Sequence, residues 1–160
     1  MSWFVLHLRP RSEKRVAQVC EIHGLEYYLP LRSETKVYQR RKVTVYKPMF
    51  PGYIFVSFSE EDKVFLQRTN HIIKILAPPS EDSLVFQLDQ IKKALLVDET
   101  LGSAGAIDEG RRVRIIGGSF MGVEGVVESA RKSGVVRLNV EMIGQAVVVE
   151  VDRDFVEMVD

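Results

Sequence analysis

The pattern of the sequence changes once along the chain, over residues 99–106, where small residues and two glycines interrupt it. Before this segment, some apolar residues alternate and others recur at helical spacing, which predicts both strands and helices. After it, short β-branched runs are separated by glycines, which predicts strands alone. We therefore predict an α+β domain over residues 1–97, a flexible linker over 98–107 and a small all-β SH3-like barrel over 108–160.

The first domain is predicted to be an antiparallel sheet with flanking helices. Its expected strands, rich in β-branched and aromatic residues, are 2–8, 25–30, 53–58 and 72–76, with a hairpin over 37–47. Its expected helices are 11–23, 60–68 and 84–96. Pro10 can open the first helix, because the missing N–H of a proline has no helical partner there. Ser59 is the expected N-cap of the second helix, and the acids after it match the helix dipole.

The second domain is expected to hold five short strands that glycine turns connect. The expected strands are 113–116, 123–129, 135–141, 146–151 and 155–158. The β-branched residues and many glycines disfavour stable helices in this region. We therefore expect it to stay a barrel.

Residues 48–58 combine two prolines, a glycine and a strand whose two faces are both apolar. Ile54, Val56 and Phe58 share one face, because side chains alternate along a strand, and Tyr53 and Phe55 share the other. One interpretation is a central strand buried on both sides. The other is that one face is core and the Tyr53 face docks a partner. This pattern alone leaves both open.

Charge is unevenly distributed, although the formal net charge is zero. Residues 1–50 hold ten Lys and Arg against four acids, whereas residues 101–160 hold seven against ten. A basic first third favours a polyanion partner there. The alternative is that surface cations happen to fall early in the chain.

Catalytic chemistry finds little support in the sequence. The three histidines, His7, His23 and His71, show no metal-ligand spacing with each other or with Cys20. No glycine-rich loop follows a strand and opens a helix, so no phosphate-binding loop is predicted. No apolar run is long enough to span a membrane. We expect a cytoplasmic, non-enzymatic protein without cofactor or metal, and a lone cysteine excludes an intrachain disulfide.

Residues 107–127 resemble a KOW motif, which pairs glycines with one aromatic residue. The matching residues are Gly110, Gly118, Phe120, Gly122 and Gly125. In such a motif Phe120 packs inward, and the glycines allow a tight turn and a strongly curved small sheet. KOW barrels occur in ribosomal proteins and in transcription elongation factors, so the motif alone does not choose between these classes.

The first half of the chain resembles the N-terminal domain of the NusG family. The matching segments are Trp3-Phe4-Val5, residues 9–16, Tyr28-Leu29-Pro30 and residues 49–56. With the KOW motif behind them, the likeness covers nearly the whole chain in the domain order of the family. Residues 9–14 and the short 32–47 segment are more similar to the specialised RfaH, LoaP and UpxY paralogues than to housekeeping NusG.

The resemblance implies a monomeric transcription elongation and antitermination factor that binds the clamp helices of the largest RNA polymerase subunit. The implied docking residues are His7, Phe50, Pro51, Tyr53 and Phe55. Non-template DNA would be contacted by Arg9, Arg15, Arg40, Arg41, Lys42, Arg68 and Thr69. The KOW domain would recruit Rho or a ribosomal protein.

Two alternatives remain open from the sequence. The nearer one is a housekeeping NusG that couples transcription to Rho or to the ribosome. The other is a ribosome-associated KOW protein that binds folded RNA, but the acidic surplus of residues 101–160 counts against it.

Overall fold

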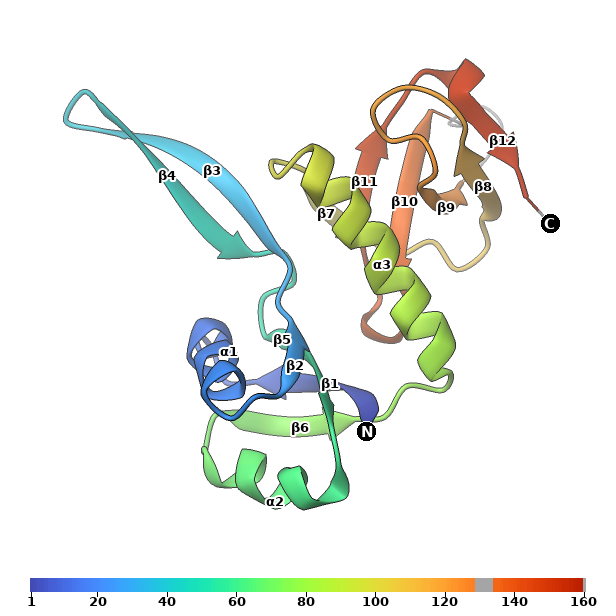
Figure 1. Ribbon diagram of the computed structural model, residues 1–160. Helices are drawn as coiled ribbons and strands as arrows, with labels where there is room; N and C mark the ends of the chain where they lie inside the picture. Colours follow the sequence, from blue (N-terminus) through green and yellow to red (C-terminus); the bar gives the residue numbers. More distant parts are fainter. Residues whose placement is uncertain (129–133, 160) are drawn as a thin grey trace. The chain divides into compact units, whose positions relative to one another are not determined.

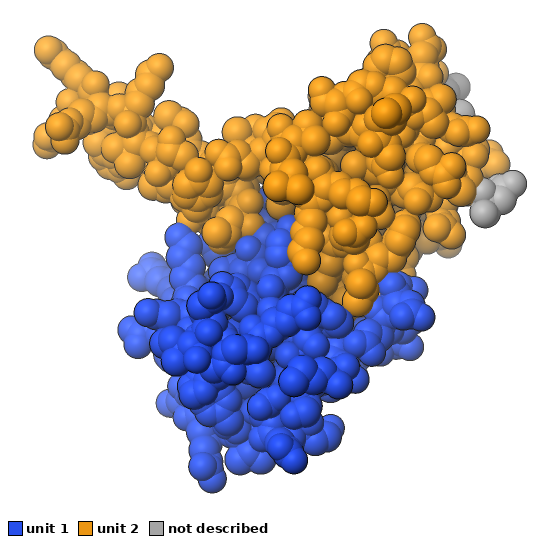
Figure 2. Space-filling view, viewed as in Figure 1, with its two compact units in different colours: residues 1–30, 48–83 blue, residues 31–47, 84–160 orange. Residues whose placement is uncertain are grey.

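A computed structural model describes residues 1–128 and 134–159. The chain forms two compact units, and each unit is assembled from two separate segments (Figure 2). The first unit contains residues 1–30 and 48–83, and the second contains residues 31–47 and 84–160. The secondary structure is α+β, as the sequence predicts.

A four-stranded antiparallel sheet forms the first unit (Figure 1). Its strands are β1 (Ser2–Leu8), β2 (Glu26–Tyr28), β5 (Tyr53–Phe58) and β6 (Ile72–Leu76). They lie in the order β2-β5-β1-β6, so β1 and β5 are the two central strands. This matches the four strands predicted for the first domain, although β2 is shorter than expected.

One hydrophobic cluster of this unit packs two helices against one face of the sheet. Helices α1 (Glu13–Ile22) and α2 (Glu60–Arg68) contribute buried apolar residues to it, Val16 and Cys20 from α1 and Leu66 from α2. The sheet contributes the inward-pointing residues of β1 and β5, which are Leu6, Leu8, Ile54, Val56 and Phe58. The prediction that the Ile54 face of this strand belongs to the core is therefore confirmed.

The start of α1 differs from the prediction, whereas α2 matches it. Arg11 has φ 62°, a left-handed conformation that no helical residue adopts, so the helix begins only at Glu13 with Ser12 as N-cap. Pro10 lies in the turn before it and does not open the helix. The α2 start follows the capping prediction, because the Ser59 backbone N–H donates to Asp62 Oδ2 at 3.1 Å.

A long hairpin opens the second unit. Its strands are β3 (Leu31–Tyr38) and β4 (Arg41–Pro48), so it starts six residues earlier than predicted. Gln39 and Arg40 form the turn with φ values of 46° and 68°, the left-handed pair that a type I′ turn requires. Arg40, Arg41 and Lys42 therefore lie at the tip, as the sequence predicts.

The rest of the second unit is helix α3 and an antiparallel sheet. Helix α3 spans Glu81–Val97, so its first turn belongs to the first unit. The sheet holds β7 (Ser103–Gly105), β8 (Arg111–Ile115), β9 (Glu124–Val127), β10 (Val135–Val140), β11 (Gln145–Glu150) and β12 (Val156–Met158). Within the described residues, the order is β12-β8-β9-β10-β11-β7. All five predicted strands are present, and the predicted end of the second one, Ser129, lies outside the described residues.

Part of the predicted linker is a strand. Residues 103–105 form β7, which pairs with residues 145–147 of β11. The pairing extends on both sides, because the Ala106 N–H donates to the Gly144 carbonyl and the Val148 N–H donates to the Gly102 carbonyl. Residues 102–106 are therefore hydrogen-bonded to the sheet, within the segment that the sequence predicts to be a flexible linker over 98–107.

Helix α3 is hydrogen-bonded to the sheet that follows it. The side-chain carbonyl of Gln90 accepts the Glu124 N–H at 2.8 Å, and that of Gln87 accepts the Glu141 N–H at 3.2 Å. Gln90 is only 3% exposed, so this contact lies in the interior of the unit. The sequence assigns α3 and the hairpin to the first domain, whereas most of α3 and the hairpin belong to the second compact unit.

Candidate functional site

The turn between β4 and β5 is held in place by the first helix. Gly52 has φ +89°, which favours glycine, and its carbonyl accepts the Leu8 N–H at 2.8 Å. The Gly52 N–H donates to Glu13 Oε2 at 3.1 Å, and the Glu13 side chain is largely buried. A buried carboxylate at the first turn of α1 therefore fixes the conformation of residues 50–53.

His7 and Tyr53 form an aromatic pair beside this turn. They are cross-strand partners in the β1–β5 register, and their rings stack at a centroid distance of 5.0 Å. Both are half-buried, and Pro51 in the adjoining turn is exposed. Three of the five predicted docking residues therefore lie close together with accessible surface. We call His7, Pro51 and Tyr53 the aromatic patch.

The other two predicted docking residues are buried. Phe50 is 1% exposed and Phe55 is 0% exposed, as is Val5, the partner of Phe55 on β1. At Phe55 the strand is therefore buried on both faces, the first of the two interpretations left open by the sequence. These phenylalanines offer no free area for a partner in this structure.

The predicted DNA-binding residues fall into two groups, one in each unit. All six cations are exposed and Thr69 is half-buried: Arg9, Arg15, Arg68 and Thr69 in the first unit, and Arg40, Arg41 and Lys42 at the hairpin tip. In the first unit, the Arg9 N–H donates to the His71 carbonyl, which places Arg9 beside the segment that follows α2. Thr69 Oγ1 donates to the Leu66 carbonyl and so helps to end α2.

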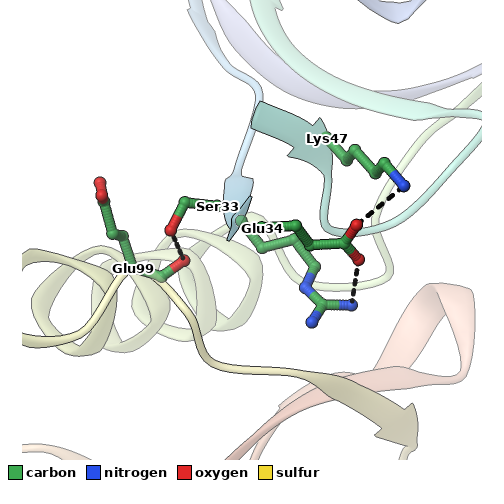
Figure 3. A network of polar contacts seen from close by, with 5 residues as sticks. Ser33, Glu34, Lys47 and Glu99 are labelled. Atoms are coloured by element: carbon green, nitrogen blue, oxygen red, sulfur yellow. Dashed lines mark hydrogen bonds and ion pairs between the residues drawn. The ribbon is translucent and has the colours of Figure 1, made fainter. Parts of the chain in front are cut away.

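The hairpin also carries a charged cluster that the sequence reasoning missed. Glu34 binds Lys47 at 2.9 Å and Arg32 at 3.5 Å (Figure 3). The hydrogen bond from Lys47 holds the pKa of the Glu34 carboxyl below its ordinary value. The spacing of residues 32, 34 and 36 places them on one face of a strand, a signal that was available in the sequence.

The opposite face of the hairpin contacts the segment after α3. The Ser33 N–H donates to the Glu99 carbonyl at 2.8 Å, and Tyr46 Oη donates to Glu99 Oε1 at 3.3 Å. Figure 3 shows Ser33 beside Glu99 and, separately, Glu34 bonded to Lys47. The base of the hairpin is thus tied to the second unit through one face.

Two glycines of the predicted KOW motif lie where another side chain would not fit. A Cβ on Gly110 would collide with the side chain of Val126. A Cβ on Gly125 would lie 2.6 Å from Val136 Cγ1 and 2.7 Å from the Arg137 carbonyl oxygen. Phe120, which was expected to pack inward, is half-buried. The glycines at positions 110 and 125 therefore allow strands β8, β9 and β10 to approach closely.

Within residues 1–128 and 134–159, no group of three or more His, Cys, Asp and Glu side chains is placed to hold a metal ion. Burial raises the pKa of the Cys20 thiol to about 11, which leaves it protonated and poorly nucleophilic. No helix in the described part of the chain is long and apolar enough to cross a membrane.

Comparison with known proteins matches residues 1–95 to the family model described as "Transcription termination factor nusG". The match covers more than half of the 160 residues. It spans β1 to β6, the three residues of the aromatic patch and the six cations predicted to bind DNA.

Proposed function

The chain belongs to the NusG family of transcription termination and elongation factors, and we propose that it is an antitermination factor that travels with RNA polymerase. The family is one of transcription factors and not of enzymes, and it suggests RNA polymerase as the partner. The observation that carries the finer proposal is the aromatic patch, a stacked His7–Tyr53 pair beside an exposed proline.

The aromatic patch is proposed to dock on the clamp helices of the largest polymerase subunit. Stacked aromatic rings and a proline offer contact area at low entropic cost, which is typical of interface anchors. The turn that carries Pro51 is held by Glu13, so little conformational freedom is lost on binding. Phe50 and Phe55, whose side chains are buried, are not part of the proposed contact surface.

Contact with non-template DNA is proposed for the exposed cations of the first unit. Arg9 and Arg15 flank the start of α1, and Arg68 ends α2. Such cations favour association with phosphates most strongly at low salt. The basic residues of the hairpin support placing the chain among the specialised paralogues. For the C-terminal sheet we propose a KOW barrel that recruits Rho or a ribosomal protein, and the close strand approach at Gly110 and Gly125 supports it.

The docking proposal is tested by measuring affinity of the full chain for a clamp-helix fragment. Tyr53→Ala and His7→Ala should each weaken binding, and a hot-spot loss of about 2 kcal/mol corresponds to roughly 30-fold. Tyr38→Ala is the matched control, because Tyr38 is an exposed tyrosine at the hairpin tip. Phe55→Ala is unsuitable, since truncating a buried phenylalanine costs about 3–5 kcal/mol of stability.

Unchanged affinity of both patch variants would exclude the aromatic patch as the docking site. Circular dichroism of each variant verifies that the sheet is intact. A loss shared equally by Tyr38→Ala would also contradict the proposal, because it would assign the contact to the hairpin instead.

A further inference from the structure

The β3–β4 hairpin is more exposed than an ordinary sheet. Four large side chains along it have exposed fractions of 68%, 58%, 39% and 45%, in the order Val37, Tyr38, Val43 and Tyr46. A two-stranded ribbon is only marginally stable by itself. Exposed apolar and aromatic side chains on such a ribbon are typical of a surface that a partner covers.

The two faces of the ribbon differ in charge and in accessibility. Alternation along each strand places Arg32, Glu34, Lys36 and Tyr38 on one face of β3, and Arg41, Val43, Val45 and Lys47 on one face of β4. The Lys47–Glu34 ion pair shows that these two sets share the same face of the ribbon. We call it the Glu34 face. The opposite face holds Ser33 and Tyr46, which contact Glu99, so the Glu34 face points away from that contact.

The Glu34 face has more cations than its own acid can neutralise. Four basic side chains, Arg32, Lys36, Arg41 and Lys47, share this face with Glu34 as its one acid. Lys36 lies next to Lys47, and the hydrogen bond and like charge of Lys47 lower the pKa of Lys36. An added anion would relieve this repulsion.

We propose that the Glu34 face is a phosphate-binding surface that places the hairpin in the major groove of duplex DNA. Arg32, Lys36, Arg41 and Lys47 contact the sugar–phosphate backbone, and the other two basic residues of the tip, Arg40 and Lys42, reach the base edges. This inference rests on the proposed function only in taking DNA as a ligand of the chain. It extends the DNA contact from the hairpin tip along the whole ribbon.

Duplex DNA fits the dimensions and chemistry of the ribbon better than a single strand does. The major groove is about 12 Å wide and admits a two-stranded β-ribbon. Arg32 and Lys36 are four residues apart on β3, about 13 Å at the usual rise of a strand, so they contact separate positions along a backbone. A single strand is usually bound by several aromatic residues on which successive bases stack. The Glu34 face has one aromatic residue, Tyr38.

The test measures binding of the full chain to a fluorescent 20-base-pair duplex of mixed sequence over a series of salt concentrations. Lys36→Gln and Lys47→Gln should each weaken binding and reduce the slope of log K against log salt by about 0.9. Glu34→Gln should have the opposite effect and tighten binding, because it removes the carboxylate that competes with phosphate. Lys92→Gln on α3 has the same loss of charge outside the hairpin and should leave the affinity unchanged.

Three results would overturn the inference. They are unchanged binding in both lysine variants, weaker binding in Glu34→Gln, or a 20-nucleotide single strand that binds as tightly as the duplex and depends equally on the two lysines. Thermal melting of each variant tests whether unfolding causes a loss of binding. Lys36→Gln removes a like-charge contact, so it should not destabilise the hairpin. Clamp-helix affinity, measured on the same variants, should not change. The two proposals can therefore fail independently.

Discussion

The hydrogen bond that Gln90 accepts from the C-terminal sheet offers a direct test of how α3 is attached. We expect Gln90→Leu, which keeps the size of the side chain, to remove the acceptor of the Glu124 N–H without opening a large cavity. The bond is 2.8 Å long and Gln90 is 3% exposed, so no water replaces the lost carbonyl easily. Leaving a buried donor without a partner costs about 1–3 kcal/mol.

This cost translates into a measurable change in amide exchange. At 1.4 kcal/mol for each factor of ten, exchange of the Glu124 amide should accelerate by about 5- to 140-fold. The measurement is amide hydrogen exchange by NMR on the full chain, which reports single residues and does not require the two units to unfold together. Gln87→Leu serves as the matched variant. Its acceptor is 3.2 Å from the Glu141 N–H at a more exposed position, so the change at Glu141 should be smaller.

One result would refute the reasoning. If the Glu124 amide exchanges at the same rate in the parent protein and in Gln90→Leu, α3 is not hydrogen-bonded to the sheet in solution. Residues 98–107 would then connect the helix to an independent domain, as the sequence suggests.

Three further predictions follow from buried groups. Gly125→Ala should destabilise the C-terminal sheet by about 1–3 kcal/mol in urea denaturation, because the new methyl group meets Val136; unchanged stability would show that the strands can separate at this point. Glu13→Ala should leave the Gly52 N–H without its acceptor and weaken clamp-helix binding, whereas Glu13→Gln keeps an acceptor and should retain binding; equal affinity of all three proteins would contradict a positioning role. Burial raises the pKa of Cys20 from 9.0 to about 11, so the folded state holds the thiol proton more tightly; stability should fall as pH rises through this range, and Cys20→Ala should lack that component of the fall.

Local signals in the sequence predicted the elements that local interactions determine. Ser59 and Asp62 cap α2 through a contact three residues apart, and the predicted helix has the same bounds as the observed one. The basic tip at Arg40, Arg41 and Lys42 was predicted for a similar reason, because strand-forming residues lie on both sides of it. The start of α1 was not predictable in this way. It depends on a left-handed Arg11 and on a bond between the Arg9 N–H and the distant His71 carbonyl.

The sequence predicted residues that lie together at the site, but it did not predict which of them are exposed. His7, Pro51 and Tyr53 were named from the resemblance and lie together, yet Phe55 is buried although it shares a face with Tyr53. Alternation assigns a side chain to a face, but it does not say which parts of that face are covered. The glutamine at position 90 was overlooked for a related reason. A polar residue on an amphipathic helix is expected at the surface, and only the tertiary structure reveals the N–H that it accepts.

The order in which the chain is synthesised bears on the hairpin. Residues 31–47 leave the ribosome early, but the Glu99 carbonyl that accepts the Ser33 N–H comes 66 residues later. At about 5–20 residues per second, the hairpin waits roughly 3–13 s for this partner. Meanwhile the segments of the first unit, which ends at residue 83, are already complete. A nascent chain thus exposes an unsupported basic ribbon, and translation speed between the hairpin and residue 99 sets how long that exposure lasts.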